Sequence, residues 1–180
     1  MKYFLQIIVA IGAVITSNLL IAHDDPIYSD SNLELTIPSV DTEDHPGFYK
    51  DVRLEFYQND LWRLTRVTTT TVLQEIYDVE LVKTDNIPIQ VFLKISGALI
   101  DGCRKLGEID VRRKEHVFEI YIHIDPHSIP ADDVACPGSV TFFTKTVPLP
   151  VYGLNAGEYE FQVNGKFNGE FTFMTDNTLP

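Results

Sequence analysis

The sequence predicts an all-β protein, an antiparallel β-sandwich that follows a short N-terminal strand module. Three observations support this prediction. Short segments in which apolar and polar residues alternate recur along the chain after residue 32. Turn-forming residues separate them, and no stretch after the first 22 residues has the periodicity of a convincing helix. Short strands joined by turns are typical of a sandwich or a barrel.

The first 22 residues predict a signal peptide, helical before cleavage. Lys2 gives a short positive start, residues 3–14 are apolar, and Ala22 is a small residue suited to the position before a cleavage site. We therefore expect an exported chain, periplasmic or secreted, with no membrane span after cleavage; an uncleaved N-terminal anchor is the alternative. Residues 23–32 are polar and turn-forming, which predicts a flexible leader.

The remaining strands follow in order from the alternation of apolar residues. Residues 33–70 are assigned to the N-terminal strand module and residues 71–180 to the sandwich. The module is expected to hold strands near 33–37, 52–57 and 61–70, where four consecutive threonines (68–71) indicate an edge strand or a linker. Strands of the sandwich are expected near 77–82, 89–95, 106–112, 118–124, 140–149, 159–163 and 167–173.

Two turns at the end of the chain refine the architecture. Asn164-Gly165 lies between two alternating segments, which is a strong hairpin signal because both turn positions need positive φ. The corner from Gly153 to Tyr159 is similar to the tyrosine corner of Ig-like sandwiches. The predicted fold class is therefore an Ig-like antiparallel β-sandwich preceded by a β-hairpin or strand module.

Charge and cysteine content restrict the setting of the protein. The net charge of −12 argues against nucleic acid as a partner, since an acidic surface repels phosphate groups. Cys103 and Cys136 are the two cysteines, and in an oxidising compartment such a pair predicts a disulfide. The predicted disulfide therefore depends on the predicted export of the chain.

From about residue 76 to residue 173 the chain resembles a family of uncharacterised exported bacterial Ig-like β-sandwich domains. The resemblance rests on Asp101-Gly102-Cys103, the loop that ends at Cys136, and the run from Gly153 to Tyr159 that precedes Val163-Asn164-Gly165. It implies the sandwich fold, a Cys103–Cys136 bridge and export. It implies no activity.

The cluster His123, Asp125 and His127 offers ligand types that suit zinc or copper. Alternation with the apolar residues of segment 118–124 places His123 on the outward side, and Pro126 forces a turn between the histidines. No further ligand has a recognisable spacing, so a solvated strand end is the favoured interpretation and no cofactor is predicted. Asp132-Asp133 lacks the spaced oxygen ligands of a calcium loop.

Enzyme signatures are absent, including nucleophile elbows, zinc-protease helices and phosphate-binding glycine loops, so the sequence predicts no enzyme. The aromatic residues at 48, 49, 57 and 62 are interpreted as core rather than as a ligand platform. Phe142 and Phe143 are adjacent, so one of them must point away from the sandwich core. Together with Phe92 and Tyr121, we expect these outward aromatics to cover the N-terminal module.

The leading functional hypothesis is a non-catalytic, exported Ig-like interaction or structural module of the cell envelope, with an envelope or extracellular protein or glycan as its partner. Two alternatives remain open. The proline-rich loop 125–138 could be presented to a protease as a secreted inhibitor, or His123 and His127 could bind a metal.

Overall fold

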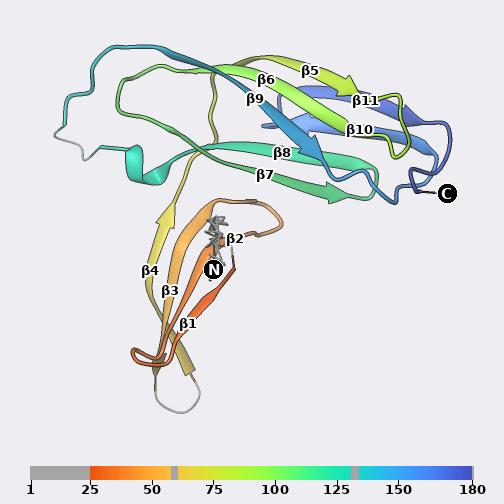
Figure 1. Cartoon of the computed structure of the whole chain (residues 1–180). Coiled ribbons are helices and arrows are strands. Elements are labelled where there is room, and N and C mark those ends of the chain that lie inside the picture. The colour runs from red at the N-terminus through yellow and green to blue at the C-terminus, as the bar shows by residue number, and fades with distance from the viewer. Residues whose placement is uncertain (1–24, 58–60, 131–133, 180) are drawn as a thin grey trace, which may run out of the picture.

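The computed structural model describes residues 25–57, 61–130 and 134–179 (Figure 1). The predicted signal peptide, the turn at 58–60 and Asp132-Asp133 lie outside these residues. Within them the chain forms strands and one short 3-10 helix, Pro126–Ser128. No helix in this described part is both long enough and apolar enough to cross a membrane.

The C-terminal strands form the predicted sandwich of two sheets. One sheet has the order β11-β10-β8-β7 and the other the order β5-β6-β9. All neighbours are antiparallel except β8 and β10, which are parallel. The bounds are β5 Ile76–Lys83, β6 Val91–Leu99, β7 Leu106–Lys114, β8 Val117–Ile124, β9 Thr141–Leu149, β10 Gly157–Val163 and β11 Phe167–Phe173.

The core lies between these two sheets and follows the predicted alternation. In β8 the four alternate apolar residues are almost completely buried, and β6 and β10 contribute alternate residues to the same cluster. Its largest side chains include Phe118, Phe171 and Phe173, with Tyr159 among them. Burying a side chain of this size contributes about 1.5–3 kcal/mol, so this cluster dominates the stability of the sandwich.

Both terminal turns are confirmed. Asn164 and Gly165 have φ of 50° and 68°, as a type I′ hairpin requires, and Val163 pairs with Phe167 across it. The Tyr159 hydroxyl donates to the carbonyl oxygen of Asn155 at 3.0 Å, which closes the tyrosine corner. Local turn chemistry was therefore sufficient to place this end of the fold.

The N-terminal strands form a separate four-stranded sheet of order β1-β2-β3-β4, which we call the N-terminal sheet (Figure 1). Its strands are β1 Ile27–Ser29, β2 Glu34–Val40, β3 Tyr49–Tyr57 and β4 Leu61–Thr69. The predicted leader, residues 23–32, is corrected here: three of its residues form β1, because they pair with Glu34, Leu35 and Thr36 of β2. At the other side of the sheet β4 is the edge strand, as the threonine run indicated.

The N-terminal sheet meets β7 and β8 at one end, through the loop before β3 and the first residues of β3. Lys50 contacts Glu108, and Arg112 donates to the carbonyl oxygens of Thr42 and Glu43. The segment after β4 runs beside β8 through a bridge between Val72 and His123. The expectation that Phe92 and Phe143 cover the N-terminal strands is wrong, because both lie on the other sheet. Phe143 packs against the sandwich core, and Phe142 is its outward neighbour, 71% exposed. Tyr121 is half-buried and lies under the guanidinium of Arg112.

Candidate functional site

The N-terminal sheet has one apolar face. Cross-strand pairing places Leu54 beside Leu35 and Leu64, and Phe56 beside Trp62, so alternate residues of neighbouring strands point the same way. We call this set the apolar face: Tyr28, Leu35, Leu54, Phe56, Trp62 and Leu64. In a two-layer fold a second sheet or a helix would cover such a surface.

The apolar face has no covering layer in the described part of the chain. Leu64 is 54% exposed, Tyr28 49% and Trp62 43%. The aromatic rings pack on one another instead, with Trp62 edge-to-face against Phe56 at 5.6 Å and against Tyr28 at 6.1 Å. The prediction that Tyr57 and Trp62 belong to a core is therefore wrong, while Phe48 and Tyr49 are partly buried as expected.

The opposite face of the same sheet is polar and carries arginines. Arg63 donates to Glu55 at 2.9 Å and stacks over the ring of Tyr57 at 5.4 Å. Arg66 of β4 pairs directly with Arg53 of β3, and the Nε of Arg53 is buried without a hydrogen-bond partner. Arg53 also lies 4.0 Å from Glu34, so among the described residues Arg66 is the arginine of this face without an acidic partner. Like charges directly opposite each other on a sheet are destabilising, which leaves Arg66 in an unfavourable position.

Among the described strands β4 pairs only with β3, so its outer edge is open to a further strand. The Phe56 N–H donates to the Leu33 carbonyl oxygen on the β2 side, so the backbone groups of Phe56 point away from β4. In an antiparallel ladder the residue opposite then also points its N–H and C=O outward. The backbone N–H and C=O groups of Trp62 therefore point toward the open edge. Leu64, two residues later on the same strand, is oriented in the same way.

A second group of chemistry-bearing residues lies where the N-terminal sheet meets the sandwich. We call it the seam: Gly47, Lys50, Glu108, Asp110 and His123. The side chain of Lys50 is 7% exposed, and its ammonium donates to Ser39 at 2.8 Å, to Glu108, and lies 3.7 Å from Asp110. Its three donors are thus directed at partners within the molecule.

The pKa of Asp110 is set by competing effects. Burial alone would raise it, but His123 and the Lys50 ammonium favour the ionised form more strongly, so the pKa falls below its ordinary value of 3.8. The Nε2 of His123 lies 3.1 Å from the Asp110 carboxylate, without the alignment of a hydrogen bond. Lys50 and His123 also line a cleft of about 270 Å³ at this junction.

A pH prediction follows from that lowered pKa. A carboxylate whose pKa is lowered by folding stabilises the native state above about pH 4, and that contribution is lost as the pH falls through the native pKa. We expect the free energy of unfolding to fall more steeply with acid in the wild type than in Asp110→Asn, measured by urea unfolding from about pH 6 to about pH 3. Parallel pH profiles for the two proteins would contradict it.

Gly47 makes the seam possible. A Cβ at this position would lie 2.0 Å from the Asp110 carboxylate, and φ is +62°, a conformation that side chains disfavour. We expect Gly47→Ala to lower the free energy of unfolding by about 2 kcal/mol through backbone strain and overpacking. The matched control is Gly138→Ala, where a Cβ would meet nothing within 4 Å. Equal denaturation midpoints for the two variants would show that the seam tolerates a side chain.

The predicted metal candidates separate in the structure. His123 does lie on the outward side of β8, but it is 1% exposed because the loop around Gly47 lies over its ring, so its predicted availability is wrong. His127 pairs with Asp51 at 2.9 Å, and the Asp125 side chain accepts from the backbone N–H of His127. Their ligand atoms do not gather at one point within the described chain.

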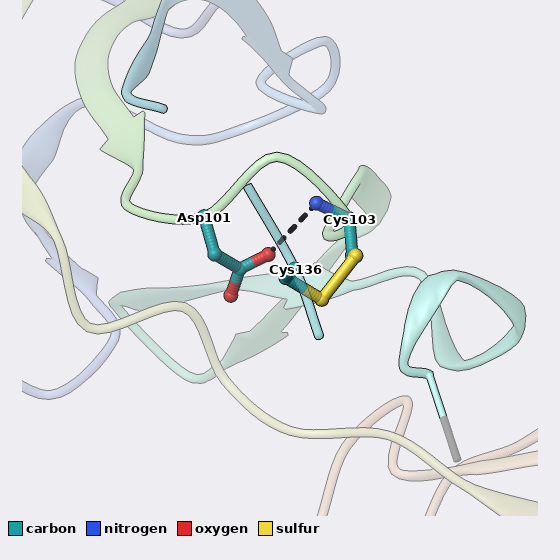
Figure 2. A group of neighbouring side chains, drawn as sticks. All are labelled: Asp101, Cys103 and Cys136. Carbon is teal, nitrogen blue, oxygen red and sulfur yellow. Dashed lines mark hydrogen bonds between the residues drawn. A yellow bond between two sulfur atoms is a disulfide. The ribbon is translucent and has the colours of Figure 1, made fainter. Parts of the chain in front are cut away.

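The predicted disulfide is present. Cys103 and Cys136 are bonded, with their Cα atoms 5.5 Å apart, and Asp101 accepts from the backbone N–H of Cys103 (Figure 2). These three side chains are the one metal-type cluster in the described residues, but the bridge occupies both sulfurs. The group therefore acts as a covalent anchor for the loop at Cys136, which Gly102 also holds through the Pro137 carbonyl oxygen.

The loop 125–138, predicted as an inhibitor element, is anchored at both ends. A 3-10 helix begins it, and the disulfide holds it near its end. Ile129 and Val134 are the exposed apolar residues in its described part. The start of the loop, Asp125 to His127, lines the cleft beside Lys50 and His123.

Sequence reasoning missed several residues that organise these surfaces. Asn177 is 1% exposed and its amide bonds to the backbone of Ile89 and Val151, and Asn164 bonds in the same way to Ile122 and Leu73. Asn177 lies outside any turn signal, and the turn signal at Asn164 does not indicate what the side-chain amide bonds to. Lys50 was missed because an alternating strand predicts which side a residue faces and not what covers it.

Comparison with known proteins supports the fold. Residues 93–173 match the family model described as the ORF11 beta-sandwich domain. No curated protein and no solved structure matches the chain. The match spans β7 to β11 and most of β6, and it leaves β5 and the N-terminal sheet outside. The C-terminal part of this chain is thus similar to a β-sandwich domain family.

Proposed function

We propose that this protein is a non-catalytic, exported interaction module that binds a partner protein of the envelope or extracellular space on the apolar face of its N-terminal sheet. The observation that carries the proposal is that face itself. A sheet that presents three leucines, a tyrosine, a phenylalanine and the single tryptophan of the chain, with no covering layer among the described residues, is typical of a binding surface.

The chemistry of the apolar face favours protein over glycan. A sugar-binding platform needs polar side chains beside its aromatic rings, since each hydroxyl group that is desolvated must find a partner. Here the rings of Phe56 and Trp62 meet edge-to-face, and apart from Tyr28 beside Trp62 the other residues of that face are leucines. Aromatic and leucine side chains packed in this way suit the apolar anchors of another polypeptide.

The seam supports a non-catalytic role. Lys50, Asp110 and His123 are the residue types that catalysis uses, but they lie against one another at a buried junction. Lys50 already has partners for its donors, and Gly47 closes over the Asp110 carboxylate. These groups are better suited to fixing the N-terminal sheet on the sandwich than to attacking a substrate.

Export is part of the proposal and has two supports. The disulfide is typical of proteins that fold in an oxidising compartment. The first 22 residues have the pattern of a signal peptide. Both features are compatible with a periplasmic or secreted module.

Site-specific photo-cross-linking in the cells that make the protein tests this function. A photo-reactive phenylalanine analogue is placed at Leu64 on the apolar face, at exposed Thr172 of β11 as the matched control, and at Val134 in the loop. We expect one polypeptide to be captured from position 64 alone. That polypeptide, once identified and purified, should bind the wild type and bind Leu64→Glu at least about tenfold more weakly, since an apolar anchor is lost and a charge is desolvated.

Two outcomes of this experiment overturn the proposal. If the captured polypeptide binds Leu64→Glu as tightly as the wild type, the apolar face is not the docking surface. If capture occurs from Val134 and a protease is the adduct, the loop carries the function and the protein is an inhibitor.

A further inference from the structure

We infer that the partner contributes an extended strand that pairs with the free edge of β4, and that this strand alternates apolar residues with acidic ones. The inference rests on the proposed function and names the partner's chemistry. It uses three features of β4: the outward backbone groups of Trp62 and Leu64, their side chains on the apolar face, and Arg63 and Arg66 on the opposite face.

The backbone argument identifies which residues receive the strand. The bond from Phe56 to Leu33 turns the backbone groups of Trp62 and Leu64 away from β3. β4 has nine residues, contains no proline and pairs only with β3 among the described strands. Long edge strands with open backbone groups are the surfaces to which peptides add as a further strand.

The apolar residues of the proposed pattern follow from the direction in which the side chains of the added strand point. Residues of an added strand that lie opposite Trp62 and Leu64 bond to their backbone groups, and their side chains point to the same face. That face is the apolar face, where Trp62 and Leu64 are about half exposed. Apolar side chains at these positions would extend the aromatic and leucine cluster and cover it.

The acidic residues of the proposed pattern follow from the arginine face of the N-terminal sheet. The intervening residues of the added strand lie on the side of Arg63 and Arg66. Arg66 is exposed and enters none of the ion pairs within the described residues. It lies opposite Arg53, which has Glu34 at 4.0 Å but whose Nε has no hydrogen-bond partner. Carboxylates at alternate positions would turn this like-charge pair into a favourable cluster, whereas lysines would add to the repulsion.

Synthetic peptides test the inference directly. The probe is a nine-residue, end-capped peptide that alternates valine and glutamate, and its counterpart replaces every glutamate with lysine. Binding is followed by the fluorescence of Trp62, the one tryptophan in the chain, which lies on the apolar face. We expect the glutamate peptide to bind at least about tenfold more tightly than the lysine peptide, since opposite charges attract across strands and like charges repel.

Variants on the protein side give the matched comparison. Arg66→Glu should weaken binding of the glutamate peptide about tenfold and strengthen binding of the lysine peptide. Lys145→Glu makes the same charge change at an exposed position on β9, an edge strand of the sandwich, and should leave both affinities unchanged. Urea unfolding of each variant confirms that it is folded before binding is compared.

N-methylation separates strand addition from simple apolar docking. Methyl groups on one alternate set of peptide amides block the hydrogen bonds to β4, and on the other set they point to solvent. We expect binding to be lost when the amides that face β4 are methylated, and to be kept when the amides that face solvent are methylated. Equal binding of both sets would overturn strand addition while leaving docking on the apolar face in place, and equal affinity of the glutamate and lysine peptides would overturn the acidic pattern.

The alternative to a partner strand at the edge of β4 is a second copy of this chain. Sedimentation of the wild type and Arg66→Glu distinguishes it. Three results together would show that a second copy covers the edge and that the inference is wrong. These are a dimeric wild type, a monomeric Arg66→Glu variant, and a wild-type dimer that the glutamate peptide does not dissociate. If no peptide binds but the cross-linked partner still depends on Leu64, the inference fails and the proposed function stands.

Discussion

Replacing both Cys103 and Cys136 with alanine is expected to lower the free energy of unfolding by about 4 kcal/mol. The bridge spans 33 residues, and by the chain-entropy estimate a loop of this length contributes about that amount. The loop it closes is not held by buried apolar side chains at that end, since Ile129 and Val134 are exposed. Urea unfolding of the oxidised protein and of the double variant measures the difference.

Reduction provides the control for the disulfide. A reductant should shift the wild type toward the midpoint of the double variant and leave the variant itself unchanged. If the reduced wild type unfolds at the same urea concentration as the oxidised protein, the bridge does not constrain the unfolded chain, and the stability of the sandwich comes from its core alone.

Lys50→Met is expected to cost about 3 kcal/mol of unfolding free energy, because removing one member of a buried charge cluster leaves the others uncompensated. Asp110 would lose a favourable charge at 3.7 Å, and Ser39 would lose its donor. This expected loss of unfolding free energy is at the low end for a buried ion pair, because Glu108 is half exposed and keeps contact with water. Methionine preserves the volume of the side chain, so the effect reports the charge.

The matched control is Lys94→Met. Lys94 pairs with Glu80 at 2.9 Å, but both side chains are exposed, and such surface pairs contribute little to stability. We expect its urea midpoint to be unchanged within error. Equal losses for Lys50→Met and Lys94→Met would contradict the role of the seam as the junction between the N-terminal sheet and the sandwich.

The sequence predicted the sandwich well because its signals are local. Alternation in β8 identified the core residues from Phe118 to Ile124, and Asn164-Gly165 identified the last hairpin. The tyrosine corner and the Cys103–Cys136 bridge were also predicted and are present. Each of these features depends on residues close in sequence or on a pair with no competing partner.

The surfaces were predicted less well because they depend on contacts between distant segments. Alternation correctly placed His123 on the outer side of β8, but only the three-dimensional arrangement shows that residues around Gly47 cover it. Conversely, Trp62 lies on a strand whose alternating pattern suggested a core, yet no second layer from the described residues covers that face. A period of two indicates that a sheet has two unlike faces and does not indicate which face is buried.

Acrylamide quenching of Trp62 in the purified protein, measured over a series of dilutions, tests most directly whether the apolar face is an open docking surface. The single tryptophan is 43% exposed, so we expect quenching to be efficient and independent of protein concentration, and to fall when the cross-linked partner or the glutamate peptide is added. A Trp62 that is shielded from acrylamide in the monomer would contradict the account, because the apolar face would then already be covered by the chain itself.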